Sequence, residues 1–316
     1  MKKKNLYIAS CDKDGGIYRY IENENGKFEF ADVTKMDRPM YMITEGDKMH
    51  VILRDPYDKK ESGLISYDIN DDGSLSNPTE ITSTKGEVAC HLASDEGNIY
   101  CVNYLSGSVT KMPDTVVCHE GKGVHPTRQD MAHTHFVCLS PDKKYIFVND
   151  LGIDKIFVYN KDLSLKSVTD MPEGHGPRHL AFHKDNETVF CVNELASTVS
   201  ILKYTDGKLT LIDTVNALPD NFNGESTAAA IRCIDDTVYV SHRGHDSVAV
   251  LKYNGKTLAL EKTISVYGNG PRDFIIFNDT IISTNQNSDN ITVISLESGK
   301  LIDEFKAKEP LCVLVR

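Results

Sequence analysis

The sequence GPRHLAF at residues 176–182, followed by TVFCVNE at 188–194, decides the fold of this chain. Two further segments of the same kind follow, TVSIL at 198–202 and LTLI at 209–212. All four are short, rich in β-branched and aromatic residues, and separated by turn-forming residues such as those of Thr205-Asp206-Gly207. This pattern predicts four consecutive strands that pair antiparallel through tight connections.

The same unit recurs along the chain. A second clear copy has GPRD at 270–273 and, after an apolar stretch, Asn285-Gln286. Weaker copies run from His91 to Asn103-Tyr104, from His135 to Asn149-Asp150, and from Ala230 to His242-Arg243. The units begin near Met40, Cys90, His135, Arg178, Ala229 and Arg272. A period of roughly 43 to 51 residues with four strands per unit is typical of a propeller blade.

The two ends of the chain complete this count. Residues 5–34 show only three strand patterns, and residues 311–315 add one strand with no unit of its own. Docking the last strand into the first unit removes two free sheet edges, so we expect it there. Sustained helical periodicity is missing, which rejects an α/β fold. We therefore predict an all-β, seven-bladed β-propeller that occupies residues 1–316 as a single domain, with its first blade closed by the C-terminal strand.

Composition narrows the function classes. The chain has 316 residues, 40% of them hydrophobic and 26% charged, and a formal net charge of -11. Nucleic-acid binding needs clustered basic residues, so we expect no nucleic-acid partner. No segment approaches the run of about 18 apolar residues that a membrane span requires, so we expect no membrane partner either. The basic run at 2–4 precedes an apolar stretch at 6–9 that is too short for a signal peptide, and we expect a cytoplasmic protein of undetermined oligomeric state.

The eight cysteines are scattered and form no Cys-x-x-Cys pair, which favours free, structural thiols. His133-Thr134-His135 alone is weak evidence for a metal, so we expect no metal site. Nucleophile elbows, phosphate-binding Gly-rich loops and dinucleotide fingerprints are also missing, and we expect no cofactor and no covalent serine chemistry.

The polar residues of the repeat predict where a site would lie. In a propeller, residues before the innermost strand and residues after the second strand open on the same face. The first group comprises His133, His135, Arg178, His179 and Arg272, and the second comprises Asp150, Glu194, His242, Arg243 and Gln286. Arginine suits anion binding because its donors form a permanently charged planar fork. A histidine or Glu194 could carry a proton, and the residues themselves leave that choice open.

Structural interpretations compete with these functional ones. Asn103, Asn149, Asn193 and Asn285 each end a strand and are expected to bond the following turn as scaffold. Asp150 could clamp its own turn at 151–152 or face a ligand. His133 and His135, preceded by Arg128-Gln129 and an unusual insertion at 118–130, are harder to explain as scaffold.

At these residues the chain resembles the seven-bladed β-propeller lactonases. That family includes one type of bacterial 6-phosphogluconolactonase and the fungal carboxy-cis,cis-muconate cyclase. The matching phrases lie at 128–129, 133–135, 140–152, 176–179, 192–195, 243–246, 271–273 and 285–290. Ala132 stands where the family often has proline, and the second blade, from Arg38 to Pro56, matches poorly.

The resemblance implies a site of one histidine, two arginines and a glutamate. These roles fall on a histidine of the His133/His135 pair, Arg178, Glu194 and Arg243. Arg128, Gln129, Asp150, His179, Arg272 and Gln286 are the expected substrate-binding residues. The implied function is hydrolysis of a small anionic sugar lactone, in first place 6-phosphoglucono-1,5-lactone. Two alternatives remain, a muconate-type lactonising cyclase and a non-catalytic interaction scaffold.

Overall fold

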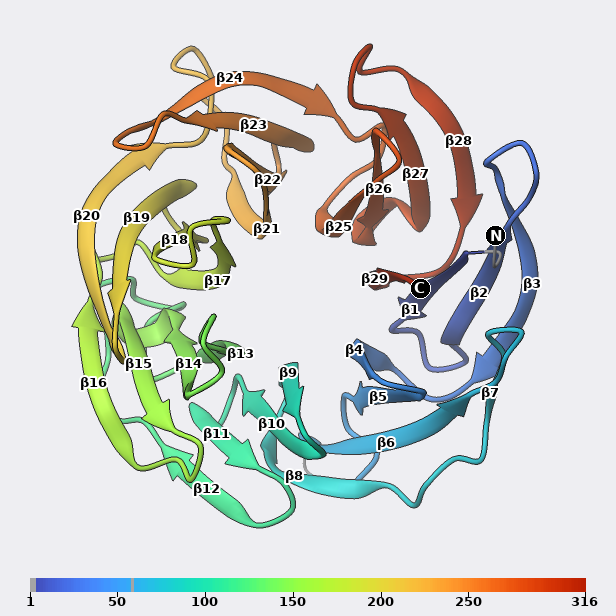
Figure 1. The fold of residues 1–316 in the computed structure, drawn as a ribbon, viewed down its shortest axis with the longest axis horizontal. Coiled ribbons are helices and arrows are strands. Elements are labelled where there is room, and N and C mark those ends of the chain that lie inside the picture. Colours follow the sequence, from blue (N-terminus) through green and yellow to red (C-terminus); the bar gives the residue numbers. More distant parts are fainter. Residues whose placement is uncertain (1–3, 58–59) are drawn as a thin grey trace.

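The computed structural model describes residues 4–57 and 60–316, which form a ring of seven β-sheets around a common axis (Figure 1). Each sheet is antiparallel, and consecutive sheets follow one another around the ring. The predicted all-β, seven-bladed propeller is confirmed. Lys2 and Lys3 of the basic run lie outside the described residues.

The blades are listed from the innermost strand outward. Blade 1 contains β29 (Pro310–Val315), β1 (Asn5–Ser10), β2 (Gly16–Glu22) and β3 (Phe28–Lys35). Blade 2 contains β4 (Pro39–Glu45), β5 (Lys48–Leu53), β6 (Glu61–Ile69), β7 (Leu75–Ser76) and β8 (Thr82–Glu87). Blade 3 contains β9 (Ala89–Asp95), β10 (Asn98–Asn103), β11 (Ser108–Lys111) and β12 (Thr115–Cys118). Blade 4 contains β13 (Thr134–Leu139), β14 (Tyr145–Asp150), β15 (Lys155–Asn160) and β16 (Leu165–Asp170).

The remaining three blades have the same plan. Blade 5 contains β17 (Pro177–Phe182), β18 (Thr188–Asn193), β19 (Thr198–Thr205) and β20 (Lys208–Asn216). Blade 6 contains β21 (Thr227–Ile234), β22 (Thr237–Arg243), β23 (Ser247–Tyr253) and β24 (Leu258–Ser265). Blade 7 contains β25 (Pro271–Phe277), β26 (Thr280–Asn285), β27 (Asn290–Ser295) and β28 (Leu301–Lys306).

The last strand closes the ring as predicted. β29 pairs antiparallel with β1, with Leu6 opposite Val315 and Ala9 opposite Cys312. The ladder continues past the strand, because the Asn5 amide donates to the Arg316 carbonyl oxygen at 2.8 Å. β29 therefore supplies the innermost strand that blade 1 lacks, and both ends of the described chain lie beside each other (Figure 1).

Blade 2 departs from the four-stranded plan. Its outer edge is divided between two strands, since β7 pairs with the Asp68 end of β6 and β8 pairs with the Glu61 end. The segment at 77–81 separates them. The divided edge lies beyond the segment from Arg38 to Pro56, which forms β4 and β5.

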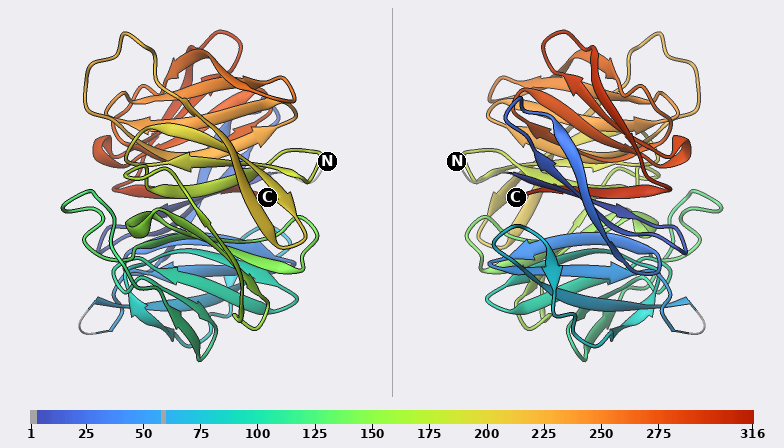
Figure 2. Two further views of the ribbon diagram at one scale, coloured as in Figure 1. Left: turned by 90° about the vertical axis from the view of Figure 1, so that its left-hand side faces the viewer. Right: turned by 90° about the vertical axis from the view of Figure 1, so that its right-hand side faces the viewer.

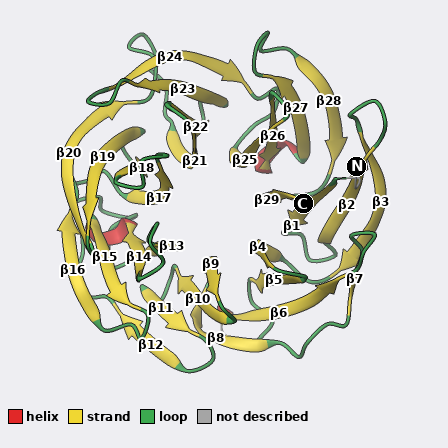
Figure 3. Ribbon diagram, in the orientation of Figure 1, coloured by secondary structure: helices red, strands yellow, loops and turns green. Residues whose placement is uncertain are grey.

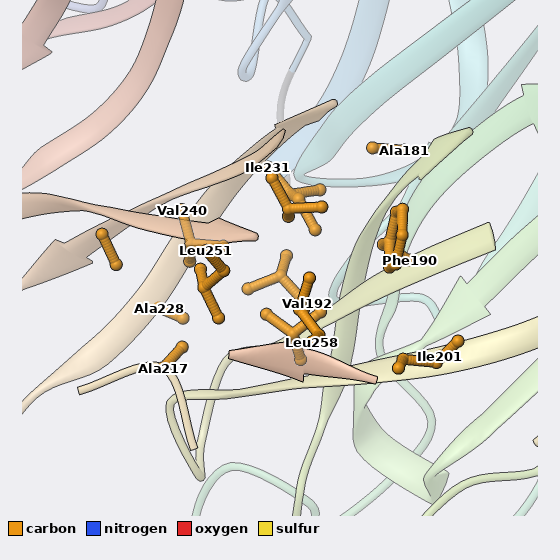
Figure 4. Packing of buried hydrophobic residues seen from close by; sticks show 13 residues of the cluster. Ala181, Phe190, Val192, Ile201, Ala217, Ala228, Ile231, Val240, Leu251 and Leu258 are labelled. Carbon is orange, nitrogen blue, oxygen red and sulfur yellow. The ribbon is translucent and has the colours of Figure 1, made fainter. Parts of the chain in front are cut away.

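Neighbouring blades are held together by apolar side chains from facing sheets. The cluster between blades 5 and 6 includes Phe190, Val192, Ile231 and Leu251, which meet from both sides (Figure 4). Each is 0 to 1% exposed. Full burial of a side chain of this size contributes about 1.5–3 kcal/mol, so the inter-blade cores stabilise the ring.

The ring is viewed edge-on in Figure 2, where the strands cross its thickness. Strands and loops make up nearly all of it, and the helices drawn in Figure 3 are short 3₁₀ turns such as Leu151–Ile153 and Gln286–Ser288. Within the described part of the chain, none of the helices has the length and apolar character needed to cross a membrane. All eight cysteines are free.

Candidate functional site

A pocket of about 360 Å³ opens at the face of the ring where the innermost strands begin. One set of lining residues occupies the second position of an innermost strand: Met40, Cys90, His135, Arg272 and Leu311. Another set ends or directly follows the second strand of a blade: Arg54, Tyr104, Glu194, Arg243 and Gln286. The two classes of position that the repeat predicts to meet are thus brought together. Arg128, from the loop before blade 4, completes the polar lining.

Glu194 lies at the centre of an arginine cluster. Its Oε2 accepts a hydrogen bond from Arg178 Nε at 2.8 Å and lies 3.1 Å from Arg243 Nη2. Its Oε1 accepts from Arg128 Nη2. The carboxylate is 1% exposed, and three positive charges from three parts of the chain converge on it.

These contacts fix the ionisation of the cluster. Burial alone would raise the pKa of Glu194, but Arg243, Arg178 and Arg128 together hold that pKa well below its usual value. Burial, together with Arg243 and Arg272, lowers the pKa of Arg178 to about 9 against the opposing effect of Glu194. Both groups are therefore charged at neutral pH, and Glu194 is a weak base.

The structure separates the two histidines of the sequence motif. His135 lines the pocket, and its Nδ1 is buried without a hydrogen-bond partner among the described residues. Burial and the nearby Arg178 lower the pKa of His135 well below 6.5, so the ring is neutral at pH 7. His133 does not line the pocket. Its ring stacks on Tyr104 with centroids 4.4 Å apart and contacts the Tyr104 carbonyl oxygen and Asp130 Oδ1 through its two nitrogens.

Asp150 lies outside the pocket lining. Its Oδ1 accepts hydrogen bonds from the His133 and Gly152 amides, and its Oδ2 lies 2.7 Å from His119 Nδ1. The hairpin register explains this placement, because Asp150 stands opposite Lys155 as Asn193 stands opposite Thr198. Asp150 therefore corresponds to Asn193 of blade 5, whereas the repeat pattern in the sequence aligns it with Glu194. The position of Glu194 is taken by Leu151.

Two other expected substrate-binding residues are also buried in the protein. Gln129 donates from Nε2 to the Leu151 carbonyl oxygen at 2.9 Å and accepts from the His125 amide, so it braces the loop that carries Arg128. His179 is buried, and its ring centroid is 5.3 Å from those of both His135 and His91. Neither residue lines the pocket.

Arg54 and Tyr104 line the pocket, and sequence reasoning did not single them out as site residues. Both directly follow the second strand of their blades, as Glu194 does. Tyr104 directly follows Asn103, the strand-end asparagine of blade 3. Arg54 follows Leu53 instead of an asparagine, so only the count of strands in blade 2 could have found it.

The pocket is positively charged although the chain as a whole carries a net charge of -11. Its lining residues include four arginines and one carboxylate, that of Glu194. With His135 neutral, the lining carries a net charge of about +3. Within residues 4–57 and 60–316, no group of three or more His, Cys, Asp or Glu side chains is arranged to hold a metal ion. The arrangement is suited to binding an anion and to transferring a proton through a neutral imidazole.

Comparison with known proteins gives a consistent result. The model of a family described as "Lactonase, 7-bladed beta-propeller" matches residues 5–315. A Staphylococcus epidermidis protein described as uncharacterized is 30% identical over 346 residues, which cover 98% of this chain and 99% of that protein.

Solved structures agree on the architecture. A crystal structure of a protein from Lactobacillus plantarum has a TM-score of 0.89 and 29% identity, with 100% of both chains covered. The periplasmic gluconolactonase PpgL of Pseudomonas aeruginosa has a TM-score of 0.89 and 24% identity, with 99% of both chains covered. At that identity, the second likeness shows the shared fold.

Proposed function

We propose, because the chain belongs to the seven-bladed β-propeller lactonase family, that it hydrolyses the cyclic ester of an anionic sugar lactone. The substrate that we favour is 6-phosphoglucono-1,5-lactone. The observation that carries the proposal is the excess of arginine in the pocket beside His135, which is buried and neutral. The gluconolactonase of Pseudomonas aeruginosa, which shares the fold, supports a sugar lactone as the substrate class.

His135 is the group that we assign as general base. A neutral imidazole can accept a proton from a water molecule while the water oxygen adds to the lactone carbonyl carbon. Glu194 is less suited to this step because its two oxygens are held by arginines and its pKa is lowered. His133 is less suited because both of its ring nitrogens already have partners in the protein.

Arginine would stabilise the charge that develops on the carbonyl oxygen. Arg243 donates from Nη2 to the Ala228 carbonyl oxygen, whereas its buried Nε has no hydrogen-bond partner among the described residues. A donor fixed in this way beside the pocket can bond an oxyanion, and loss of one such donor typically costs a factor of about 10² to 10³ in rate. Collapse of the intermediate breaks the bond to the ring oxygen. That oxygen takes the proton from His135 and leaves as a hydroxyl group. The carboxylic acid that forms releases its own proton to solvent and becomes a carboxylate.

The experiment compares His135→Asn with His133→Asn in a pH-stat assay of acid release from 6-phosphoglucono-1,5-lactone. We expect His135→Asn to lower kcat/KM at least about 100-fold, the typical worth of a general base. His133→Asn should lower kcat/KM much less, because that histidine acts only through its packing on Tyr104. Circular dichroism checks that both variants are folded.

Two results would overturn the proposal. One is a wild-type rate no higher than that of spontaneous hydrolysis, and the other is a His135→Asn variant as active as wild type. A muconate-type dicarboxylate is assayed in parallel, because its carboxylates would also suit the arginines and it represents the alternative cyclase reaction. The cytoplasmic location stays a prediction, which fractionation of the native cells would test.

A further inference from the structure

We propose that Arg54 and Arg272 form a binding subsite for a phosphate monoester of the substrate. This inference rests on the proposed lactonase function and specifies how the pocket would hold its ligand. The subsite is built by blades 7, 1 and 2, which lie across the ring from β17 and β18 of blade 5 (Figure 1). It lies on the wall of the same pocket that faces Glu194.

Both arginines face the same small region around blade 1. Arg272 is the second residue of β25, Arg54 follows β5, and Leu311 of β29 lies between those blades in the pocket wall. Cys11 of blade 1 is buried in this region, with its Sγ 3.3 Å from Met40 Sδ. Burial raises the pKa of Cys11 to about 11, and Arg54 and Arg272 both act against this rise. The two arginines therefore line one pocket from either side of blade 1.

The charges in this region are not balanced by the protein. Among the described residues Arg272 has no carboxylate partner, and its only side-chain hydrogen bond is from Nη1 to Gln286 Oε1 at 3.4 Å. Glu194, the one carboxylate in the lining, is already bonded to Arg128 and Arg178. Burial and the repulsion of Arg243 lower the pKa of Arg272 against the opposing effect of Glu194. A bound anion would favour the charged form of Arg272.

The chemistry of a sugar lactone indicates which anion this is. The reacting carboxyl group is esterified and carries no charge, so the charge must come from another substituent. A phosphate monoester carries about -1.5 to -2 charges at pH 7 and three acceptor oxygens, which match two guanidinium groups approaching from different directions. With the phosphate held at blades 7 and 2, the lactone ring would reach toward His135 of blade 4.

The approach to this subsite is also basic. A second hollow shares Arg54, Val88 and Leu105 with the pocket and is further lined by Arg38 and Lys60. Arg38 is paired with Asp55 at 3.0 Å and with Asp37 at 2.9 Å, so Arg54 and Lys60 are the cations of this hollow without a carboxylate partner among the described residues. Positive potential along an entrance raises the rate at which anions arrive.

The test measures kcat/KM for 6-phosphoglucono-1,5-lactone and for glucono-1,5-lactone with wild type, Arg54→Gln and Arg272→Gln. Arg54 is exposed, so Arg54→Gln is expected to fold. We expect the preference for the phosphorylated substrate to fall at least about tenfold in each variant, mainly through a higher KM, because each variant loses a charge-assisted contact. Arg316→Gln, an arginine outside the pocket lining, is the matched control and should keep the wild-type preference.

Calorimetric titration with inorganic phosphate gives a readout that does not depend on activity. Weaker binding of phosphate by both variants than by wild type supports the subsite even if neither lactone is hydrolysed, in which case only the proposed function fails. Equal phosphate affinity in all proteins, or an equal loss of activity toward both lactones, overturns the subsite and leaves the lactonase proposal standing.

Discussion

The two sides of the pocket differ in how their arginines are paired. On the side of blade 5, Arg128, Arg178 and Arg243 share one carboxylate partner, Glu194. On the side of blades 7 and 2, Arg272 and Arg54 face the pocket with no carboxylate in the lining besides Glu194. In the first arrangement, ion pairs with Glu194 hold the arginines in fixed positions. The second leaves charge available, so it is the side that gains most when an anion binds.

Removing the carboxylate should have the largest effect on this contrast. In Glu194→Gln, three arginines lose their common partner while the shape of the side chain is kept. We expect the free energy of unfolding to fall by about 3–5 kcal/mol, the usual cost of breaking a buried ion pair. Urea denaturation measures this. The matched control is Glu187→Gln, which breaks the exposed pair with Lys203 and should cost no more than about 1 kcal/mol. Equal losses in the two variants would contradict the contrast.

Lowering the pH is a second way to disturb the pocket, because protonation of buried histidines adds positive charge near its arginines. Burial lowers the pKa of His91, His135 and His179 well below 6.5, and Arg178 lowers each further. In the unfolded chain these groups titrate near 6.5, so below that pH the unfolded state binds more protons than the folded state. Their contribution to stability is fully present above pH 6.5 and is lost as the pH falls toward the lowered pKa values.

From pH 7.5 to 5.5 each of these histidines should therefore cost about 1.4 kcal/mol, or up to about 4 kcal/mol for the three together. Urea denaturation at the two pH values measures the loss. His91→Gln should remove about one third of the pH dependence attributed to these histidines. A variant with the full wild-type pH dependence would show that folding does not lower the pKa of His91.

The smallest expected effect has the opposite sign. Arg272→Gln removes a cation that the protein does not neutralise, so we expect the free energy of unfolding to stay level or rise by up to about 1 kcal/mol. Arg178→Gln is the matched control on the other side, where loss of the pair with Glu194 should lower it by about 3 kcal/mol. The contrast between the two sides fails if Arg272→Gln destabilises the protein as much as Arg178→Gln does.

Most of the architecture could be predicted from the sequence because each blade repeats one local pattern. The period, the missing strand in residues 5–34 and the extra strand at 311–315 together predicted the ring and its closure. The divided edge of blade 2 was not predicted. Its two outer segments are separated by residues 77–81, and pairing with opposite ends of β6 is a tertiary property that no local pattern reveals.

The candidate site was less predictable than the fold. Glu194, Arg243 and Gln286 line the pocket as predicted, because their place at the end of a second strand follows from the repeat. The placement of Asp150 depends on a one-residue difference in hairpin register. The sequence Asn149-Asp150 does not reveal this difference, because either asparagine or aspartate can occupy the strand-end position. Choosing His135 over His133 required knowing that Tyr104, from the preceding blade, packs against the His133 ring.

The closing strand also has a consequence for the timing of synthesis. Leu311 of β29 forms part of the pocket wall, and β29 can pair with β1 only after nearly the whole described chain has been made. Arg272, the neighbouring cation of blade 7, also comes from the last quarter of the sequence. A nascent chain on the ribosome therefore has no finished pocket until Pro310–Val315 has emerged and docked. The proposed phosphate subsite is therefore complete only when the first and last strands have met.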